Sequence, residues 1–493
     1  MTISRLRAPA FLSAVVSVAI AFTIAQPAAA RLNTTITASG AFGTLPVVAF
    51  DGTEAISSLF RYEVDVVTDA AHPIAFDAVL GSEVTVNVTD GQTTRQFSGM
   101  CDRISESSGD ALTYRLELVP KLALLAMTQD SRIFQDQSVP AILQSVLASH
   151  GIDFQLALTG QYEPRNYCVQ YRESDFNFIS RLMEEEGIYY FFTHGPSGHR
   201  MIVGDSSGSS PALQVPANFL PAVQRPDAEG LFAWQKTQEL RPAKVTLFDF
   251  NFQLPDEHLE ATSSIQPSVA VGSVTHRLDL PATAGLDVYD YPGGYAKHFD
   301  AESDLQKIFT ENGRAATVRM QELASTAIVI DGTGNLPQFA AGASFMLAQH
   351  PNGNGQYVLT SVHHSTTQQG SKLDYQNTFT CIPSALPFRP PRVTPRPAIG
   401  AQTAVVVGPA GEEVFTDKYA RVKVQFHWDR QGKNDANSSA WIRVGALHAG
   451  EEFVFLTVPR IGQEVIVDFL EGDPDQPIIT GSVYGPHYLP PPP

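Results

Sequence analysis

Residues 459–485 read PRIGQEVIVDFLEGDPDQPIITGSVYG, two strand-like runs separated by an acidic turn that contains proline. In the first run Val465, Val467 and Phe469 recur at every second position, which is the period of a strand with one buried face. The second run, Pro477–Val483, is rich in β-branched residues. This stretch therefore predicts two neighbouring strands of a β-domain, joined by the turn around Gly472 and Pro474.

The sequence before this stretch supplies further strands at regular spacing. In ARVKVQFHW (420–428) one face carries Val422, Val424, Phe426 and Trp428, and the opposite face carries Arg421, Lys423, Gln425 and His427. AWIRVGAL (440–447) and EEFVFLTV (451–458) add two more short strands. Many short strands at this spacing favour a barrel, because closure removes exposed edges. We predict a small all-β barrel over residues 401–484.

The chain before the barrel alternates strands with a few helices. Helical spacing of apolar residues predicts one helix between Ser138 and Gly151 and another that ends at Gly187, followed by a strand over 188–192. A further helical pattern covers residues 300–323. The fold class is therefore mainly β with some helices (α+β). A proline-rich segment, 383–400, separates this region (31–382) from the barrel as a stiff, extended connector, and a proline-rich stub (485–493) ends the chain.

The composition excludes several functions. The 493 residues carry a formal net charge of −18, which argues against nucleic acid and against stable docking on anionic membranes. The cysteines Cys101, Cys168 and Cys381 lie far apart and form no zinc-binding pair, so we expect isolated thiols.

The N-terminus has the pattern of a secretory signal. Arg5 and Arg7 precede an apolar run over 10–25, and Ala28 and Ala30 form an A-x-A arrangement. A translated upstream extension with a misassigned start is the alternative explanation of residues 1–30.

The acidic turn is the first candidate site. Asp468, Glu471, Asp473 and Asp475 fall within eight positions. They lack the spacing of an EF-hand loop, and one turn cannot supply two carboxylates that face each other across a cleft. A solvated turn at the barrel rim is the favoured interpretation.

Two histidine pairs are weaker candidates. His427 and Asp429 could share one face of a strand, whereas the adjacent His363 and His364 would face opposite sides. We interpret them as ordinary surface or edge residues. No nucleophile elbow, phosphate loop or dinucleotide fingerprint is present, so we assign no catalytic, cofactor-binding or metal-binding residue.

Several long segments resemble VgrG, the spike protein of type VI secretion systems. They include DSRIFQDQSVPAILQSVLASHGI (130–152), YCVQYRESDFNFISRLMEEEGIYYFF (167–192) and CIPSALPFRPPRVTPRP (381–397). After the connector, QTAVVVGPAGEEVFTDKYARVKVQFHWD (402–429) and the opening stretch resemble that family's OB-type barrel. The resemblance spans residues 40 to 484 in order.

This resemblance implies a fold and partners. The fold is a β-barrel hub over 31–382, related to contractile-phage baseplate hubs, followed by the OB-type barrel. The partners are two further copies in a homotrimer, an Hcp-like tube protein, baseplate proteins and a PAAR-type tip or effector protein. The function it implies is structural, so no enzymatic activity and no cofactor are expected, and the protein should be assembled in the cytoplasm and exported through the machine.

The sequence departs from the family pattern twice. It ends at GPHYLPPPP, where family members continue into a β-helical needle, so we expect a hub that lacks its own needle. The secretory leader conflicts with assembly in the cytoplasm, and a misassigned or recruited N-terminus is favoured. Two other hypotheses remain open: a hub of a phage tail or another contractile device, and a secreted hydrolase that uses Asp468 and Glu471.

Overall fold

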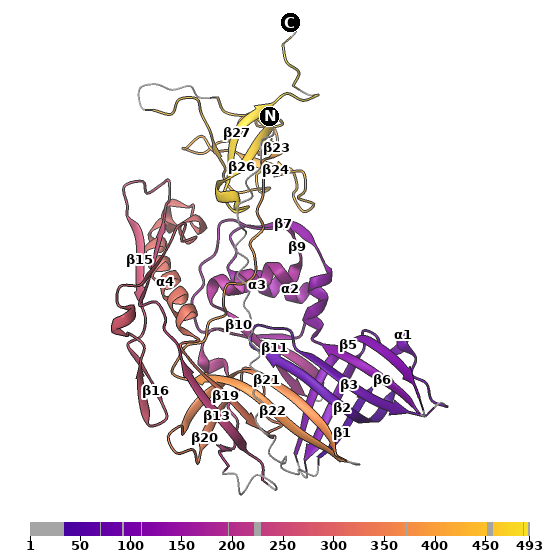
Figure 1. Ribbon diagram of the computed structural model, residues 1–493. Coiled ribbons are helices and arrows are strands. Elements are labelled where there is room, and N and C mark those ends of the chain that lie inside the picture. Colours follow the sequence, from indigo (N-terminus) through magenta and orange to yellow (C-terminus); the bar gives the residue numbers. More distant parts are fainter. Residues whose placement is uncertain are drawn as a thin grey trace, which may run out of the picture.

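The described chain is an elongated stack with two β-barrels at one end and a third barrel at the other (Figure 1). The computed structural model describes residues 34–491 except 70, 91–92, 110, 196, 221–227, 370–371, 451–456 and 487. The predicted leader, residues 1–30, lies outside the described residues. The mainly β fold with barrels in the hub region confirms the predicted fold class.

The first barrel closes from six antiparallel strands. Their order is β1-β4-β5-β6-β3-β2, and β2 pairs back with β1. The close approach of β2 to β3 requires glycine at position 52, because a Cβ there would lie 2.3 Å from the Tyr62 ring. The strands are β1 (Thr34–Gly40), β2 (Gly43–Ala55), β3 (Arg61–Thr68), β4 (Glu83–Asp90), β5 (Thr93–Ser108) and β6 (Leu112–Val119).

A second barrel continues the same twelve-stranded sheet through the pairing of β2 with β21. From β21 the sheet runs through β22 and β19 to β13, and on the other side through β20 to β12. A bridge between Phe219 and Leu231 brings the two ends together. The strands are β12 (Ala217–Asn218), β13 (Leu231–Gln238), β19 (Ile328–Gly334), β20 (Ser344–Ala348), β21 (Gly355–Gln369) and β22 (Lys372–Pro383).

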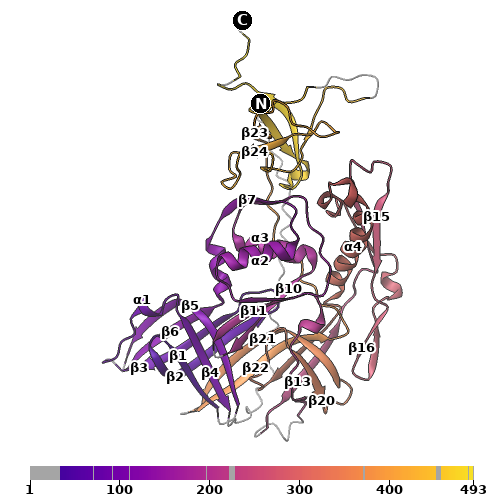
Figure 2. The same cartoon turned by 180° about the vertical axis from the view of Figure 1, so that it is seen from behind.

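Helices α2 (Val139–Ser149) and α3 (Asp175–Glu186) lie between these barrels and the third one (Figure 2). The predicted limits hold: Gly151 and Gly187 both adopt positive φ after the helices. Ser174 caps α3 by accepting a hydrogen bond from the Asn177 amide at 3.0 Å, whereas Ser138 precedes α2 without a side-chain cap. This layer also contains β7 (Asp130–Phe134), β8 (Phe154–Ala157), β9 (Cys168–Glu173), β10 (Tyr189–Gly195) and β11 (Gly198–Gly204).

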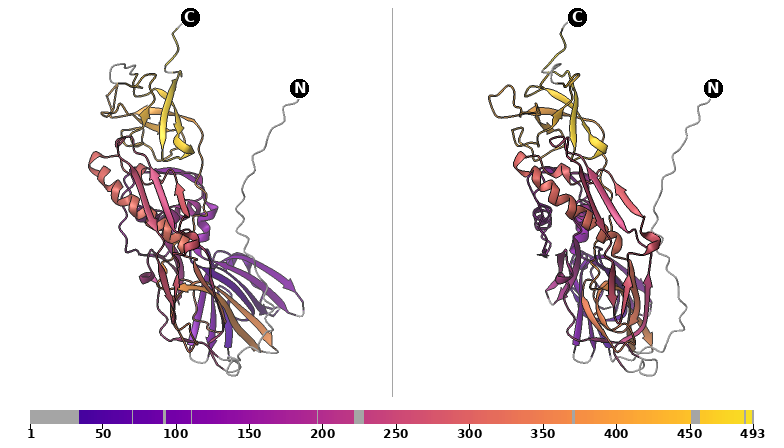
Figure 3. Two further views of the ribbon diagram at one scale, coloured as in Figure 1. Left: turned by 60° about the vertical axis from the view of Figure 1, so that its left-hand side comes forward. Right: turned by 90° about the vertical axis from the view of Figure 1, so that its left-hand side faces the viewer.

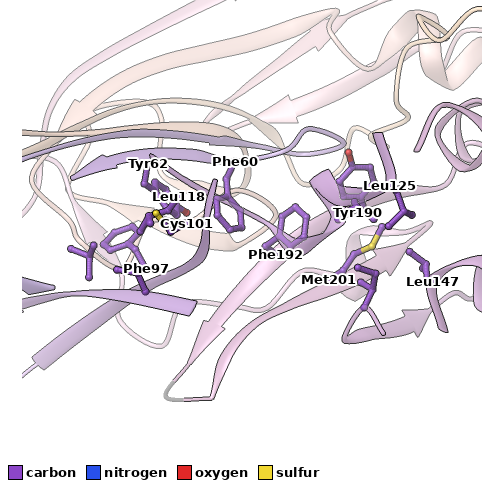
Figure 4. Packing of buried hydrophobic residues seen from close by; sticks show 14 of the residues in the cluster. Phe60, Tyr62, Phe97, Cys101, Leu118, Leu125, Leu147, Tyr190, Phe192 and Met201 are labelled. Atoms are coloured by element: carbon purple, nitrogen blue, oxygen red, sulfur yellow. The ribbon is translucent and has the colours of Figure 1, made fainter. Parts of the chain in front are cut away.

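The main core joins this layer to the first barrel. Phe60 and Tyr62 stack with ring centroids 4.7 Å apart, and Phe192 meets Phe60 edge-on at 5.1 Å (Figure 4). Apolar side chains of α2 and α3 belong to the same buried cluster. Burial of this apolar area supplies the main stabilisation of the layer, and it fixes α3 relative to the barrel.

A smaller sheet forms a separate lobe beside this layer, covered on one face by α4 (Figure 3). Its order is β15-β14-β18. The predicted helical segment begins as a 3₁₀ turn over Glu302–Lys307 and continues as α4 (Ile308–Ala324). The strands of this lobe are β14 (Lys244–Asp249), β15 (Leu259–Ser264), β16 (Ser268–Val271), β17 (Val274–Arg277) and β18 (Asp287–Asp290).

The C-terminal barrel consists of β23 (Gln402–Val407), β24 (Lys423–Phe426), β25 (Arg443–Val444), β26 (Glu464–Phe469) and β27 (Pro477–Val483). Its sheet order is β24-β23-β26-β27-β25, and a bridge between Val422 and Ile442 brings its two ends together. The predicted inward residues of β26 are buried. Of AWIRVGAL only Arg443–Val444 form a strand, and most of EEFVFLTV falls outside the described residues.

The outer face predicted for ARVKVQFHW needs a correction. Val422, Val424 and Phe426 are buried as predicted, but Arg421 and Gln425 are buried as well. Arg421 forms ion pairs with Asp417 and with Asp300, a residue of the hub region. A strand face that looks polar in sequence is therefore covered by a distant segment that supplies the opposite charge.

Candidate functional site

The acidic turn divides into an exposed half and a buried half. Asp468 and Glu471 are exposed, and the Asp468 carboxylate accepts a hydrogen bond from the Phe469 amide. Asp473 and Asp475 are each only 7% exposed. The prediction of a wholly solvated turn is therefore wrong for Asp473 and Asp475, because segments far away in the sequence cover them.

Two cations bind the buried half. Lys297 Nζ lies 2.5 Å from Asp473 Oδ2 and 3.0 Å from Asp475 Oδ2. Arg396 Nη1 lies 2.6 Å from Asp473 Oδ2, and Asp475 Oδ1 accepts the Val169 amide hydrogen at 2.7 Å. We call Lys297, Arg396, Asp473 and Asp475 the acidic clamp. It ties the C-terminal barrel to β9, to the segment before α4 and to the connector.

The charges of the clamp depend on one another. Burial alone would raise the pKa of Asp473, but Lys297 and Arg396 outweigh burial and hold this pKa at about 2. The carboxylate therefore stays ionised at neutral pH. Removing one partner of such a buried pair leaves an uncompensated charge, which costs much more than the pair itself contributes.

The end of α3 binds the connector from the other side. Glu184 accepts hydrogen bonds from the amides of Val393 and Thr394, at 3.0 and 2.9 Å, and from the Thr394 hydroxyl at 2.7 Å. Glu185 forms an ion pair with Arg396, so α3 and the clamp share this arginine. The connector is extended, as predicted, but it is also anchored along its length.

Three more arginines complete a layer of charged side chains around α3, α4 and the connector, which we call the charged layer. Arg165 pairs with Glu185 and Glu186, Arg181 pairs with Glu173 at 2.8 Å, and Arg314 from α4 pairs with Glu186. All of these residues except Glu173 line a cavity of about 260 Å³ between α3, α4 and the connector. Positive and negative side chains alternate around this cavity, so it does not select a ligand of one charge. We call the contact between hub, connector and barrel that these side chains form the charged joint.

The sequence contained only partial signals for this joint. Three consecutive glutamates, 184–186, and the arginines of the proline-rich segment are complementary in charge. Nothing in the sequence around Lys297 indicates that it pairs with residues 176 and 178 positions away. The joint is therefore visible only after the chain has folded.

The histidine predictions divide in the same way. His427 is exposed and lies 3.2 Å from the Thr403 hydroxyl, while Asp429 caps a turn by accepting the amides of Gln431 and Gly432. They do not converge on a ligand position.

His363 and His364 face opposite sides of β21, as predicted. His363 is partly exposed beside Asp51, but the surface interpretation is wrong for His364, which is fully buried. Its two ring nitrogens lie 2.6 Å from the Tyr375 hydroxyl and 3.0 Å from Glu54 Oε1. Burial lowers the pKa of His364, so a neutral ring fills this polar position in the core.

The three cysteines are free and buried, as expected. Burial raises the pKa of the Cys101 thiol to about 11 and that of Cys168 to about 12. Among the described residues, His, Cys, Asp and Glu side chains form no group of three that could hold a metal ion. Within the same ranges, every helix is too short or too polar to cross a membrane.

Comparisons with known proteins agree with this architecture. Residues 53–370 match the family model of the phage tail baseplate hub (GPD). Residues 402–484 match the model of the type VI secretion system/phage-baseplate injector OB domain. The two matched segments flank the connector that the charged layer anchors.

The curated relatives include spike proteins. The type VI secretion system spike protein VgrG1a of Pseudomonas aeruginosa is 39% identical over 453 residues, which cover 88% of this chain and 66% of that protein. The actin cross-linking toxin VgrG1 of Vibrio cholerae is 35% identical over 476 residues, covering 91% of this chain and 41% of that protein. The chain thus spans less than two thirds of the length of these relatives.

A solved structure shares the fold. The E. coli c3393 protein, described as a component of the type VI secretion system with structural similarity to the T4 bacteriophage tail proteins gp27 and gp5, superimposes with a TM-score of 0.61 at 20% identity. The match covers 89% of this chain and 97% of that one. With its two matched domains and its close relatives, the chain belongs to the phage tail baseplate hub family, in the group that contains the VgrG spike proteins of type VI secretion systems.

Proposed function

We propose that this chain is the hub of a type VI secretion tip, a structural part that holds the spike on the tube and carries or delivers effectors. Residues 31–382 would form the hub, 383–400 the connector and 401–484 the OB-type barrel. Two observations carry the proposal: the similarity to spike proteins over most of the chain, and the charged joint between the two matched domains of this chain. A tip that is driven forward must transmit force from hub to barrel without bending.

The joint is suited to that task. Buried ion pairs and hydrogen bonds link four segments: the acidic turn of the barrel, the segment around Lys297, the end of α3 and the connector. Because buried pairs are screened little by salt and hold one geometry, they favour a fixed orientation of the barrel on the hub. A flexible linker would let the barrel tilt under load.

The proposed partners follow from the family. Three copies would form a homotrimer seated on an Hcp-like tube protein and surrounded by baseplate proteins, with a PAAR-type tip or an effector bound at the barrel end. The acidic net charge suits protein partners rather than nucleic acid or anionic membranes. Assembly would take place in the cytoplasm, with export through the machine.

We further propose that the chain itself is not an enzyme. The carboxylates suggested for a hydrolase, Asp468 and Glu471, are exposed, and the Asp468 carboxylate accepts the amide hydrogen of its own neighbour, Phe469. A test compares peptidoglycan turnover by the parent chain with that of Asp468→Asn and Glu471→Gln. Turnover by the parent that disappears in both variants would contradict this proposal.

One observation favours a second candidate function. The hub model that matches residues 53–370 describes phage tails, so the chain could serve in a phage tail or another contractile device. Genes for an Hcp-like tube and a sheath next to its gene support secretion, whereas neighbouring capsid genes support the phage tail.

The decisive experiment measures secretion. Deleting the gene in its bacterium should abolish release of the Hcp-like protein into the medium, and the wild-type gene should restore it. Light scattering on the purified chain should give about three times the mass of one chain. Undiminished Hcp release in the deletion strain, with no second hub gene present, would refute the proposal.

A further inference from the structure

The two hub barrels share one sheet along a short ladder. Residues 51–55 of β2 pair there with residues 361–365 of β21 in antiparallel register (Figure 1). We call this ladder the seam. It contains a carboxylate, Glu54, of which only 3% is exposed. Burial acts to raise the pKa of Glu54, but hydrogen bonds from two histidines and the charge of an arginine outweigh burial, so the carboxylate is ionised.

One oxygen of Glu54 binds the first histidine. His364 Nε2 lies 3.0 Å from Glu54 Oε1, and His364 Nδ1 lies 2.6 Å from the Tyr375 hydroxyl. An ionised carboxylate can only accept, so Nε2 donates to Glu54, and the neutral ring accepts the Tyr375 hydrogen at Nδ1. Asn377 Nδ2 donates in turn to the Tyr375 oxygen at 3.3 Å. Each donor in this chain therefore has an acceptor as long as His364 is neutral.

The other oxygen of Glu54 faces a second histidine, His194 of β10. His194 Nε2 lies 3.8 Å from Glu54 Oε2. The Tyr62 hydroxyl lies 3.4 Å from the same oxygen and 3.2 Å from His194 Nε2. The side chain of His194 is fully buried, and its Nδ1 lies 3.1 Å from the backbone of Ser98. Glu54 thus connects β10 and the second barrel to the first barrel.

A single carboxylate balances the charges of this network. Arg95 Nη2 lies 3.9 Å from Glu54 Oε1, so these two groups neutralise each other while both histidines are neutral. Within the described parts of the chain, no second carboxylate forms an ion pair with His194 or His364. The other titratable groups that face the two histidines are Tyr62, Tyr375, His363 of β21 and His199 of β11, which pairs with Glu83.

Protonation of both histidines would leave two positive charges without a counter-ion. Two imidazolium rings and Arg95 would then share the one carboxylate of Glu54, and buried charges without a counter-ion are strongly unfavourable. Burial, together with the charge of Arg95, accordingly lowers the pKa of His194 and of His364. The closed seam therefore holds neutral rings. If the seam opens, water solvates the rings, and they take up protons below about pH 6.5.

We propose that the seam is an acid-sensitive switch, closed while His194 and His364 are neutral and opened when both take up a proton. Opening means that β2 separates from β21 locally while the rest of the chain stays folded. A cavity of about 230 Å³ beside the network, with Arg95 and His194 in its wall, leaves room for this movement. The switch rests on the geometry of the hub and is independent of the secretion function proposed above.

Hydrogen exchange of the full chain at pH 7.5 and at pH 5.5, measured by mass spectrometry, tests the switch. After correction for the intrinsic exchange rate at each pH, the protection of the backbone amides reports how often the seam opens. Each histidine that takes up a proton on opening contributes up to about tenfold, so the seam amides should lose about 10- to 100-fold in protection at pH 5.5. Amides of α2 should remain at least about tenfold better protected than the seam at pH 5.5, because opening leaves α2 folded.

Variants assign the effect to the two histidines. His194→Gln combined with His364→Gln keeps polar side chains that cannot take up a proton, so protection of the seam should agree within about threefold at the two pH values. Either single variant, which perturbs the core less, should show about half of the parent's change on a logarithmic scale. His72→Gln, at an exposed histidine that pairs with Asp69, should behave like the parent. An unchanged seam in the parent, equal protection of the seam and α2 at pH 5.5, or an undiminished pH effect in the variants would each overturn the proposal.

Discussion

Asp475 provides the sharpest test of the acidic clamp. Its side chain is 1% exposed, Oδ2 pairs with Lys297 at 3.0 Å, and Oδ1 accepts the Val169 amide at 2.7 Å. Asp475→Ala removes one of the two carboxylates of Lys297 and leaves the Val169 amide without its acceptor. Breaking a buried pair costs about 3–5 kcal/mol and an unpaired buried amide about 1–3 kcal/mol. Because Lys297 keeps Asp473, we expect the barrel to lose about 3–4 kcal/mol of its free energy of unfolding.

Tryptophan fluorescence during urea unfolding measures this loss. Trp234→Phe removes the hub signal and leaves Trp428 and Trp441, both in the C-terminal barrel region. Trp428 meets Tyr171 of the hub region edge-on at 5.6 Å, so its emission also reports separation of the two domains. The two-state test is that fluorescence and circular dichroism give the same barrel transition.

The same turn supplies the control. Asp468→Ala changes an exposed aspartate seven positions away that, among the described residues, accepts only the amide of its own neighbour. It should change the free energy of unfolding by less than about 0.5 kcal/mol. Asp475→Asn keeps an acceptor for the Val169 amide but removes the charge, so it should fall between the parent and Asp475→Ala. A loss below about 1 kcal/mol in Asp475→Ala, or equal losses in Asp475→Ala and Asp468→Ala, would refute the clamp.

Three further predictions concern the connector, the buried histidines and the thiols. Arg396→Met should lower the free energy of unfolding by about 2 kcal/mol and speed tryptic cleavage within the connector, because it breaks the ion pairs with Glu185 and Asp473. Arg460→Met, at an exposed ion pair, should change neither quantity. Equal cleavage in the two variants would contradict an anchored connector. Burial lowers the pKa of five histidines, so the unfolded chain takes up protons below about pH 6.5 that the folded chain does not. The free energy of unfolding should therefore fall between pH 6.5 and 5, by up to about 1.4 kcal/mol per pH unit for each histidine, and stay level from pH 7 to 8. Urea titrations with no slope between pH 6.5 and 5 would be the opposite result. These histidines are His194, His276, His298, His350 and His364. A thiol reagent should label no cysteine in the native chain and all three in urea, and rapid labelling without urea would show that the cores open readily.

Much of the fold was predictable because local patterns decide it. Alternation in Val465, Val467 and Phe469 predicted a strand, and the glycines at 151 and 187 predicted where two helices end. These patterns need no information about distant segments. The resemblance to spike proteins added the order of the domains, which periodicity alone could not provide.

The candidate site was far less predictable. The sequence gives the four carboxylates of the acidic turn the same local chemistry, and it cannot tell the exposed Asp468 and Glu471 from the buried Asp473 and Asp475. His363 and His364 differ in the same way, since only the second reaches the core. Burial depends on which segments fold over a residue, and those segments lie up to hundreds of positions away.

The sequence by itself determined the strands, the helices, the extended connector and the family of this protein, because each depends on local periodicity, on proline or on residue identity along the chain. Only the tertiary structure decided that Lys297 and Arg396 meet the acidic turn. The physical reason is that ion pairs and pockets depend on distance in space, and folding alone brings such separated residues within a few ångströms of each other.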